Sequence, residues 1–193
     1  FALGRGRTCD VSALRDIGRE LGYRLGVVSP CRVDGELVSS TLVRKLIEDG
    51  EVRRAARFLG RYYSVSGSVV EGQGRGHAMG FPTANVDVPP QKLLPGDGVY
   101  TAMVRLEEQR PAVVNVGVRP TFGGHERTVE AHLLGFDGDL VGEEVHVSFV
   151  RRLRDERRFE GVEDLRRQIA SDVAAACGIL AEVGVMEEMP GGL

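Results

Sequence analysis

Between residues 61 and 150 the chain contains short segments in which apolar and polar residues alternate. A period of two is typical of strands that bury one face, because successive side chains of a strand point to opposite sides. Clusters of Gly, Pro, Asn and Asp between the segments favour tight turns. The candidate strands are Tyr63–Val70, Thr83–Val88, Tyr100–Leu106, Ala112–Val118, Thr128–Leu134 and Glu144–Val150. Six short strands at this spacing predict a mainly β fold, a small closed antiparallel barrel.

Helical spacing of apolar residues occurs on both sides of these strands. A helix is predicted after them over about Val162–Cys177, with an apolar stripe of Leu165, Ile169, Val173 and Ala176. Before them, residues 1–58 predict an α/β segment that is too short for a complete domain, because a parallel sheet must be covered on both faces. Its predicted elements are helices over Val11–Leu21, Leu42–Asp49 and Val52–Leu59 and a short strand over Tyr23–Pro30.

Composition limits the classes of function. With 42% apolar and 27% charged residues the composition is globular, and a net charge of −3 provides no broad positive field for nucleic acid or a membrane surface. No apolar run approaches the roughly 18 residues that a membrane span needs. Three widely separated cysteines form no CxxC pair, so we expect a reducing, cytoplasmic location. Because the chain begins with Phe1 rather than Met, we expect a fragment.

A glycine-rich stretch lies between the first two predicted strands. Residues 72–85 have the sequence GQGRGHAMGFPTAN, without the Gly-Lys-Ser/Thr of a P-loop. Glycine backbone can approach a ligand closely, and successive N–H groups of such a loop can hold phosphate oxygens. If the chain after Pro82 is extended, Thr83 and Asn85 share one face and offer oxygen atoms to a hard cation such as Mg²⁺. These residues predict a nucleotide-phosphate site with a metal, although a simple hairpin or bulge explains the same glycines.

The hexapeptide GFPTAN at residues 80–85 resembles the signature of riboflavin kinases, and further motifs follow in the order found in that family. Upstream, Ser39–Arg44 resembles a motif that lies late in the FMN adenylyltransferase domain. From Phe1 to about Ala176 the chain is similar to the C-terminal two thirds of the bacterial bifunctional riboflavin kinase/FAD synthetases. The motifs after the hexapeptide are Leu94-Pro95, Gly98–Tyr100, Asn115–Phe122, Val129–Leu133, Phe136–Leu140, Leu153-Arg154 and Phe159.

This resemblance implies a domain organisation and an activity. Residues 1–58 would be the remnant of an adenylyltransferase domain whose N-terminal part is missing, residues 59–185 a riboflavin kinase domain and residues 186–193 a disordered tail. The barrel would be Greek-key-like. The expected reaction is transfer of a phosphoryl group from ATP, with Mg²⁺, to the ribityl 5′-hydroxyl of riboflavin, which gives FMN and ADP.

The resemblance also implies roles for individual residues. Glu130 would be the general base, and Thr83 and Asn85 would bind the metal. Arg154 and Phe159 would contact the flavin, and His132 would support packing. The residues expected around ATP are Gly72, Gly74, Arg75, Gly76, His77, Gly80 and Pro82.

Each of these residues also has a purely structural explanation. Glu130 fits the polar face of a strand, and Arg154 belongs to a mixed charge run of the kind that usually faces solvent. Val141 stands where the family commonly has Tyr, which bears on the packing beside the flavin.

Two further functions stay open at this point. The chain could be part of a bifunctional enzyme that also adenylylates FMN. We predict no FAD synthesis by this chain, because the His-x-Gly-His motif of the adenylyltransferase domain does not occur in it. Without that motif, the expected role of Ser39–Thr41 is to cap a helix. The chain could also be a flavin-binding module without turnover, but such a module needs neither metal ligands nor a base.

Overall fold

The structure is a computed structural model that describes residues 6, 9–72, 76, 80–121 and 124–183 of the 193-residue chain. The chain divides into two compact units, residues 1–38 and residues 39–193, and each is described by itself. The predicted tail, residues 186–193, lies outside the described residues.

The first unit consists of one helix and one very short hairpin. Helix α1, Val11–Leu21, begins where the Asp10 carboxylate accepts a hydrogen bond from the Ala13 N–H at 2.9 Å. The hairpin pairs β1, Arg32–Val33, with β2, Glu36–Leu37. The strand predicted over Tyr23–Pro30 is wrong, because this segment pairs with no neighbouring strand and has no regular structure. Its apolar residues satisfied the pattern, but a strand also requires a partner for its backbone groups.

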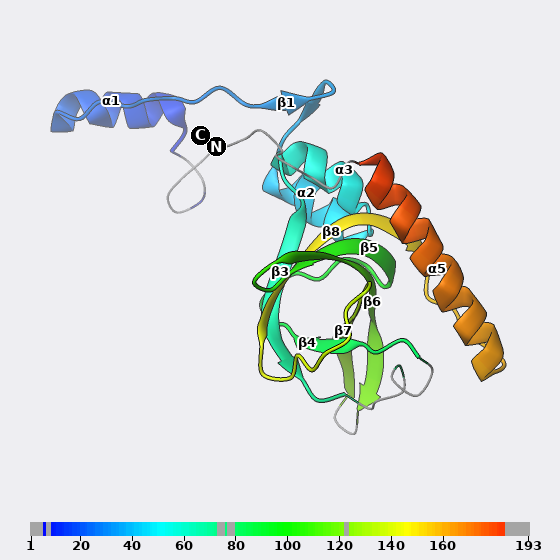
Figure 1. Cartoon of the computed structure of the whole chain (residues 1–193). Helices are drawn as coiled ribbons and strands as arrows, with labels where there is room; N and C mark the ends of the chain where they lie inside the picture. The colour runs from blue at the N-terminus through cyan, green and yellow to red at the C-terminus, as the bar shows by residue number, and fades with distance from the viewer. Residues whose placement is uncertain (1–5, 7–8, 73–75, 77–79, 122–123, 184–193) are drawn as a thin grey trace. The chain divides into compact units, whose positions relative to one another are not determined.

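The second unit is built around a closed barrel of six antiparallel strands (Figure 1). The strand order is β3-β4-β7-β6-β5-β8, so β4 pairs with β7 rather than with the strand that follows it. This architecture confirms the predicted mainly β fold. The strands are β3 Tyr63–Val70, β4 Ala84–Asp87, β5 Gly98–Arg105, β6 Gln109–Thr121, β7 Gly124–Leu133 and β8 Glu144–Arg154.

Side-chain alternation fills the barrel interior with small and β-branched residues. Tyr100 and Phe149 are the largest side chains there, and their rings meet edge to face at a centroid distance of 5.4 Å. Burial raises the pKa of Tyr100, so its hydroxyl stays protonated and donates to the Gly96 carbonyl oxygen. The valines of the interior cluster are Val52, Val65, Val69, Val86, Val104, Val114, Val116, Val129, Val145 and Val147.

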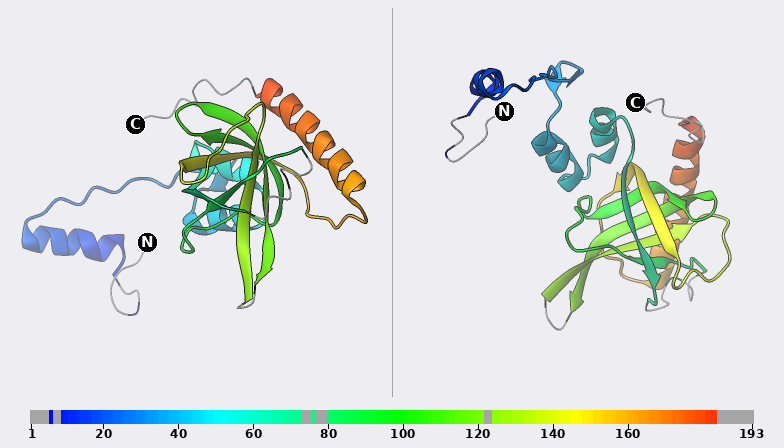
Figure 2. Two further views of the ribbon diagram at one scale, coloured as in Figure 1. Left: turned by 60° about the horizontal axis from the view of Figure 1, so that its bottom comes forward. Right: turned by 90° about the vertical axis from the view of Figure 1, so that its left-hand side faces the viewer.

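Helix α5, Val162–Glu182, runs along the outside of the barrel (Figures 1 and 2). It continues five residues beyond the predicted end at Cys177, because Leu180 is buried against Met103 and Val150. Ala176 packs in a second cluster with Val99 and Val113. Strand β5 is therefore buried on both faces, by the barrel interior and by α5.

Helix α2, Ser40–Glu48, packs against α3, Val52–Leu59, and α3 packs against β3 and β8 of the barrel. Val52 belongs to the interior cluster, and the Gly96 N–H donates to the Ile47 carbonyl oxygen at 3.0 Å. Ser39 caps α2 by accepting a hydrogen bond from the Leu42 N–H at 3.2 Å. By packing, the chain thus divides at residue 38. The domain boundary predicted at residue 58 stays a prediction.

Candidate functional site

Three polar side chains form a row across neighbouring strands. In the strand register, Asn85 on β4 lies opposite Glu130 on β7, and Glu130 lies opposite Asn115 on β6. The residues that flank each of them in sequence belong to the interior cluster, so alternation directs the three polar side chains outward. The predicted base and one predicted metal ligand are therefore direct neighbours in the sheet.

The first cavity has a volume of about 550 Å³ and contains the predicted metal pair. Thr83 and Asn85 line it together with Gly72 and Pro82, which were predicted to contact ATP. An apolar wall completes this cavity. Its members are Val69, Val70, Ala131, Leu133, Phe136, Leu140 and Val141.

Glycine backbone lies against both predicted metal ligands. A Cβ on Gly76 would overlap the Phe81 carbonyl oxygen and would lie 3.0 Å from Thr83 Oγ1, and a Cβ on Gly72 would overlap the Asn85 amide. Only glycine leaves room for this approach. Gly80 adopts a φ of 81°, a left-handed conformation that glycine accepts without strain. Gly74, Arg75 and His77 lie outside the described residues.

The second cavity has a volume of about 600 Å³ and contains the predicted base. Its walls are the outer face of β5 to β7, residues 154–159 and the first half of α5. Glu130, Arg154 and Phe159 all line it. Its apolar members are Phe81, Val99, Val113, Leu165 and Ile169. Leu165 and Ile169 come from the predicted apolar stripe of α5, so half of that stripe faces this cavity rather than the core.

Thr83 lines both cavities, which therefore adjoin at this residue. The structure brings Gly72, Pro82 and Asn85 together in the first cavity, and Glu130, Arg154 and Phe159 together in the second. Gly76, which was predicted to contact ATP, lines the second cavity. Thr83 is exposed, and Glu130 is half-buried. A group bound in one cavity could react with a group bound in the other only near this junction.

A buried ion pair orders the second cavity. Arg154 donates from Nε and from one terminal nitrogen to the Asp172 carboxylate, at 3.1 and 2.8 Å, and only 6% of the Asp172 side chain is exposed. Gln168 Nε2 donates to the same carboxylate at 2.6 Å. The Arg154 guanidinium also lies 5.8 Å from the centre of the Phe159 ring. The charge of Arg154 is thus compensated, and the pair fixes the segment that carries Phe159 to α5.

Sequence reasoning missed Asp172 and Glu156. Asp172 could have been noticed in the sequence as an acidic residue on the apolar side of the predicted helix, four positions after Gln168. Glu156 accepts a hydrogen bond from Asn115 Nδ2 at 3.2 Å, and its carboxylate fills the space that a Cβ on Gly117 would take. This contact joins the second cavity's loop to the strand beside Glu130.

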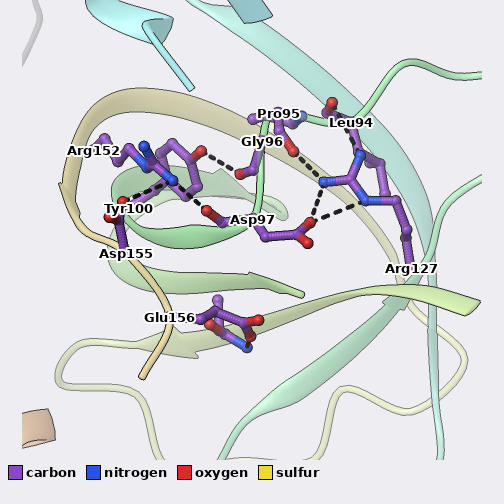
Figure 3. A network of polar contacts seen from close by, with 10 residues as sticks. Leu94, Pro95, Gly96, Asp97, Tyr100, Arg127, Arg152, Asp155 and Glu156 are labelled. Atoms are coloured by element: carbon purple, nitrogen blue, oxygen red, sulfur yellow. Dashed lines mark hydrogen bonds and ion pairs between the residues drawn. The ribbon is translucent and has the colours of Figure 1, made fainter. Parts of the chain in front are cut away.

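A polar network anchors the start of that loop (Figure 3). Arg127 on β7 pairs with the Asp97 carboxylate at 2.6 Å, and Arg152 on β8 donates to the Asp97 carbonyl oxygen from the other side. Arg152 also pairs with Asp155 at 3.0 Å. These contacts tie residue 155 to the turn before β5 and so hold the neighbouring Glu156 near Asn115.

The donor set at the junction suits a hard cation that is held mainly by phosphates. Thr83 and Asn85 offer neutral oxygen atoms, and the glycine backbone beside them leaves space that any side chain would fill. Among the residues that the structure describes, no group of three or more His, Cys, Asp or Glu side chains could hold a metal ion. Thr83 and Asn85 are therefore the residues at this junction that could hold a hard cation.

Comparisons with known proteins agree with this architecture. A family model described as riboflavin kinase matches residues 59–180. A bifunctional riboflavin kinase/FMN adenylyltransferase of Pseudomonas fluorescens is 38% identical over 183 residues, which are 94% of this chain and 58% of that protein. The protein of the same name from Escherichia coli K12 is 36% identical over 178 residues, which are 91% of this chain and 56% of that protein.

A crystal structure described as a macrolide-efflux protein from Streptococcus pneumoniae superposes with a TM-score of 0.82 at 30% identity. The superposed part covers 92% of this chain and 57% of the Streptococcus pneumoniae chain. The family model and the curated relatives define the class: the chain belongs to the riboflavin kinase family. It spans little more than half the length of the curated relatives it matches.

Within the described part of the chain, no helix is both long and apolar enough to cross a membrane.

Proposed function

We propose that this chain transfers the γ-phosphoryl group of ATP to the ribityl 5′-hydroxyl of riboflavin and releases FMN and ADP. The observation that carries the proposal is the register pair Asn85–Glu130 at the junction of two cavities. Directly opposed residues of an antiparallel pair have Cα atoms about 4.5–5.5 Å apart. A base and a metal ligand at that separation can act on one reacting phosphorus.

The nucleotide would occupy the first cavity. Phosphoryl transfer asks a protein mainly to position the reactants and to neutralise charge. The backbone of Gly72 lies against Asn85 and that of Gly76 against Thr83, so both could approach the phosphates. Mg²⁺, held by these two side chains and by phosphate oxygens, would neutralise the charge of the phosphates. The apolar wall suits the adenine base.

Riboflavin would occupy the second cavity. Its volume of about 600 Å³ lies within the range usual for small-molecule sites. The isoalloxazine ring fits the apolar residues between the barrel and α5, near Arg154 and Phe159. The ribityl chain would then run toward Thr83 and Glu130. The Glu130 carboxylate accepts the 5′-hydroxyl proton while that oxygen bonds to the γ-phosphorus and the bond to the ADP oxygen breaks.

The same proposal covers the domain division and the location. We assign residues 59–185 to the kinase domain and residues 1–58 to the end of an adenylyltransferase domain that is incomplete here. The chain itself would therefore make FMN and no FAD. The use of ATP and the three free cysteines fit a cytoplasmic enzyme.

The test is chromatography of flavins after incubation of the purified chain with riboflavin, ATP and Mg²⁺. We expect FMN without FAD, and we expect Thr83→Ala to reduce the rate on the order of 100-fold, the cost of misplacing a reacting group. Because Thr83 also lines the second cavity, flavin fluorescence should measure riboflavin binding to Thr83→Ala separately from the rate. No FMN from a folded protein that binds riboflavin would instead support a flavin-binding module.

A further inference from the structure

The ladder between β4 and β7 stops one position before the candidate metal site. The last register pair at this end is Ala84 with Ala131, so Thr83 and His132 would be the next pair. Thr83 belongs to no strand, whereas β7 continues through His132 and pairs there with Val113 on its other side. The chain at Thr83 thus leaves the ladder at the residue where the two cavities adjoin.

The His132 side chain contacts the backbone just beyond the end of this ladder. Its Nδ1 lies 2.8 Å from the Pro82 carbonyl oxygen. A carbonyl oxygen only accepts hydrogen bonds, so Nδ1 must carry the hydrogen. This carbonyl belongs to the peptide unit that joins Pro82 to Thr83, so the bond fixes the peptide plane directly before the candidate metal ligand. The proline ring fixes the φ angle on the other side of Pro82.

The opposite side of this segment is held as well. The Phe81 N–H donates to the Gly76 carbonyl oxygen at 2.9 Å, and the Phe81 ring meets the His132 ring edge to face at 5.5 Å. Gly76 in turn lies against Thr83 Oγ1. Thr83 is therefore set between the backbone of Gly76 and a peptide unit oriented by His132.

We propose that His132 is a positioning residue for the metal–nucleotide site. It acts through the Pro82 carbonyl on the Thr83 hydroxyl and has no part in proton transfer. The inference rests on the proposed function, since it deepens the role given to Thr83. Although His132 lines the second cavity, its loss should affect nucleotide binding that depends on Mg²⁺ more than it affects riboflavin binding.

Three substitutions separate this role from simple packing. His132→Asn places an amide nitrogen as many bonds from Cα as Nδ1, so it keeps the donor in place. His132→Gln places the donor one bond further, and His132→Leu removes it. The matched control is His146→Leu. His146 also makes a hydrogen bond through Nδ1, at 2.8 Å from Ser66 Oγ on the neighbouring strand, but the residue lines neither cavity.

The measurement is the affinity of ADP by isothermal titration calorimetry, with Mg²⁺ and with EDTA. In the wild type we expect Mg²⁺ to tighten ADP binding. In His132→Leu the increase in ADP affinity caused by Mg²⁺ should be about tenfold smaller, the upper range for one hydrogen bond. The ADP affinity in EDTA should stay unchanged. His132→Asn and His146→Leu should keep the gain, and His132→Gln should fall between. Melting temperatures by circular dichroism show whether each variant is folded.

The outcomes separate this inference from the proposed function. An unchanged Mg²⁺ gain in folded His132→Leu, or an equal loss in His132→Asn, overturns the positioning role even if the wild type makes FMN. Absence of FMN from a wild type that shows the expected ADP affinities overturns the kinase proposal and leaves the role of His132 supported. Loss of riboflavin affinity alone in His132→Leu would assign His132 to the second cavity and also overturn the inference.

Discussion

The two cavities that adjoin at Thr83 are built in different ways. The first cavity is lined by residues 69–72, residues 82–85 and residues within 131–141, and glycine backbone lies directly against its Asn85 side chain. The second cavity is assembled from the outer face of the barrel, the loop after β8 and the first half of α5. Strand ends and a close glycine backbone shape the first cavity, whereas packing of α5 and its preceding loop on the barrel shapes the second. Substitutions should therefore affect the two binding reactions separately.

A substitution of Glu130 in the second cavity should show the largest effect. Glu130→Gln keeps the size of the side chain and one acceptor oxygen, but its amide group cannot take up the proton. We expect kcat to fall by about 10²- to 10⁴-fold, while the affinities for riboflavin and for MgADP stay at wild-type values. Stopped assays of FMN formation and separate binding titrations check this. A wild-type rate would show that Glu130 is a polar strand residue without a role in proton transfer.

A substitution in the helix should affect the second cavity alone. Asp172→Ala leaves the Arg154 guanidinium without its buried partner, so we expect a loss of about 3 kcal/mol in the free energy of unfolding. Riboflavin affinity should fall and MgADP affinity should stay unchanged. The control is Asp164→Ala, which breaks an exposed pair with Arg167 on the same helix and should cost less than about 1 kcal/mol.

Urea unfolding and riboflavin fluorescence titration measure both effects of Asp172→Ala. A destabilised variant with wild-type riboflavin affinity would mean that the ion pair only supports the fold.

A substitution at Gly72, which lines the first cavity and not the second, should affect the first cavity alone. Gly72→Ala puts a methyl group into the Asn85 amide, so the two must shift apart. We expect the Kd of MgADP to rise about tenfold, with riboflavin affinity preserved. Gly178→Ala is the matched control, because nothing lies within 4 Å of its new Cβ in α5. Calorimetry that shows equal MgADP affinity in both variants would contradict the close approach of backbone and nucleotide.

The smallest effect concerns a histidine away from both cavities. Burial, together with the charges of Arg105, Lys92 and Arg61, lowers the pKa of His146 below its ordinary value of 6.5. Below about pH 6.5 the unfolded chain therefore binds a proton at His146 more readily than the folded chain does. The contribution of His146 to the free energy of unfolding has its full value above that pH and decreases as the pH falls. His146→Gln should remove this part of the pH dependence. Urea midpoints at pH 8 and pH 5 test it, and parallel pH dependence in both proteins would contradict it.

The sequence predicted the barrel well because its signals are local. Alternation in Tyr63–Val70 gave both ends of β3 correctly, since the strand has one face in the interior and the other outside. The same reasoning failed for Tyr23–Pro30, because the pattern cannot tell whether a pairing partner exists. It also placed the end of α5 too early, because the burial of Leu180 depends on Met103 and Val150 in distant strands.

The sequence by itself determined the strand pattern and the residues of the glycine loop with its Thr and Asn, and through motif resemblance it singled out Glu130. These features depend on alternation, on glycine's missing side chain and on residue type, which neighbours in the chain define. Only the tertiary structure placed Glu130 opposite Asn85, paired Arg154 with Asp172, and brought Glu156 to Asn115 and His132 to the Pro82 carbonyl. These are contacts between segments that meet because the barrel closes and α5 packs across it, and no local pattern specifies their distances.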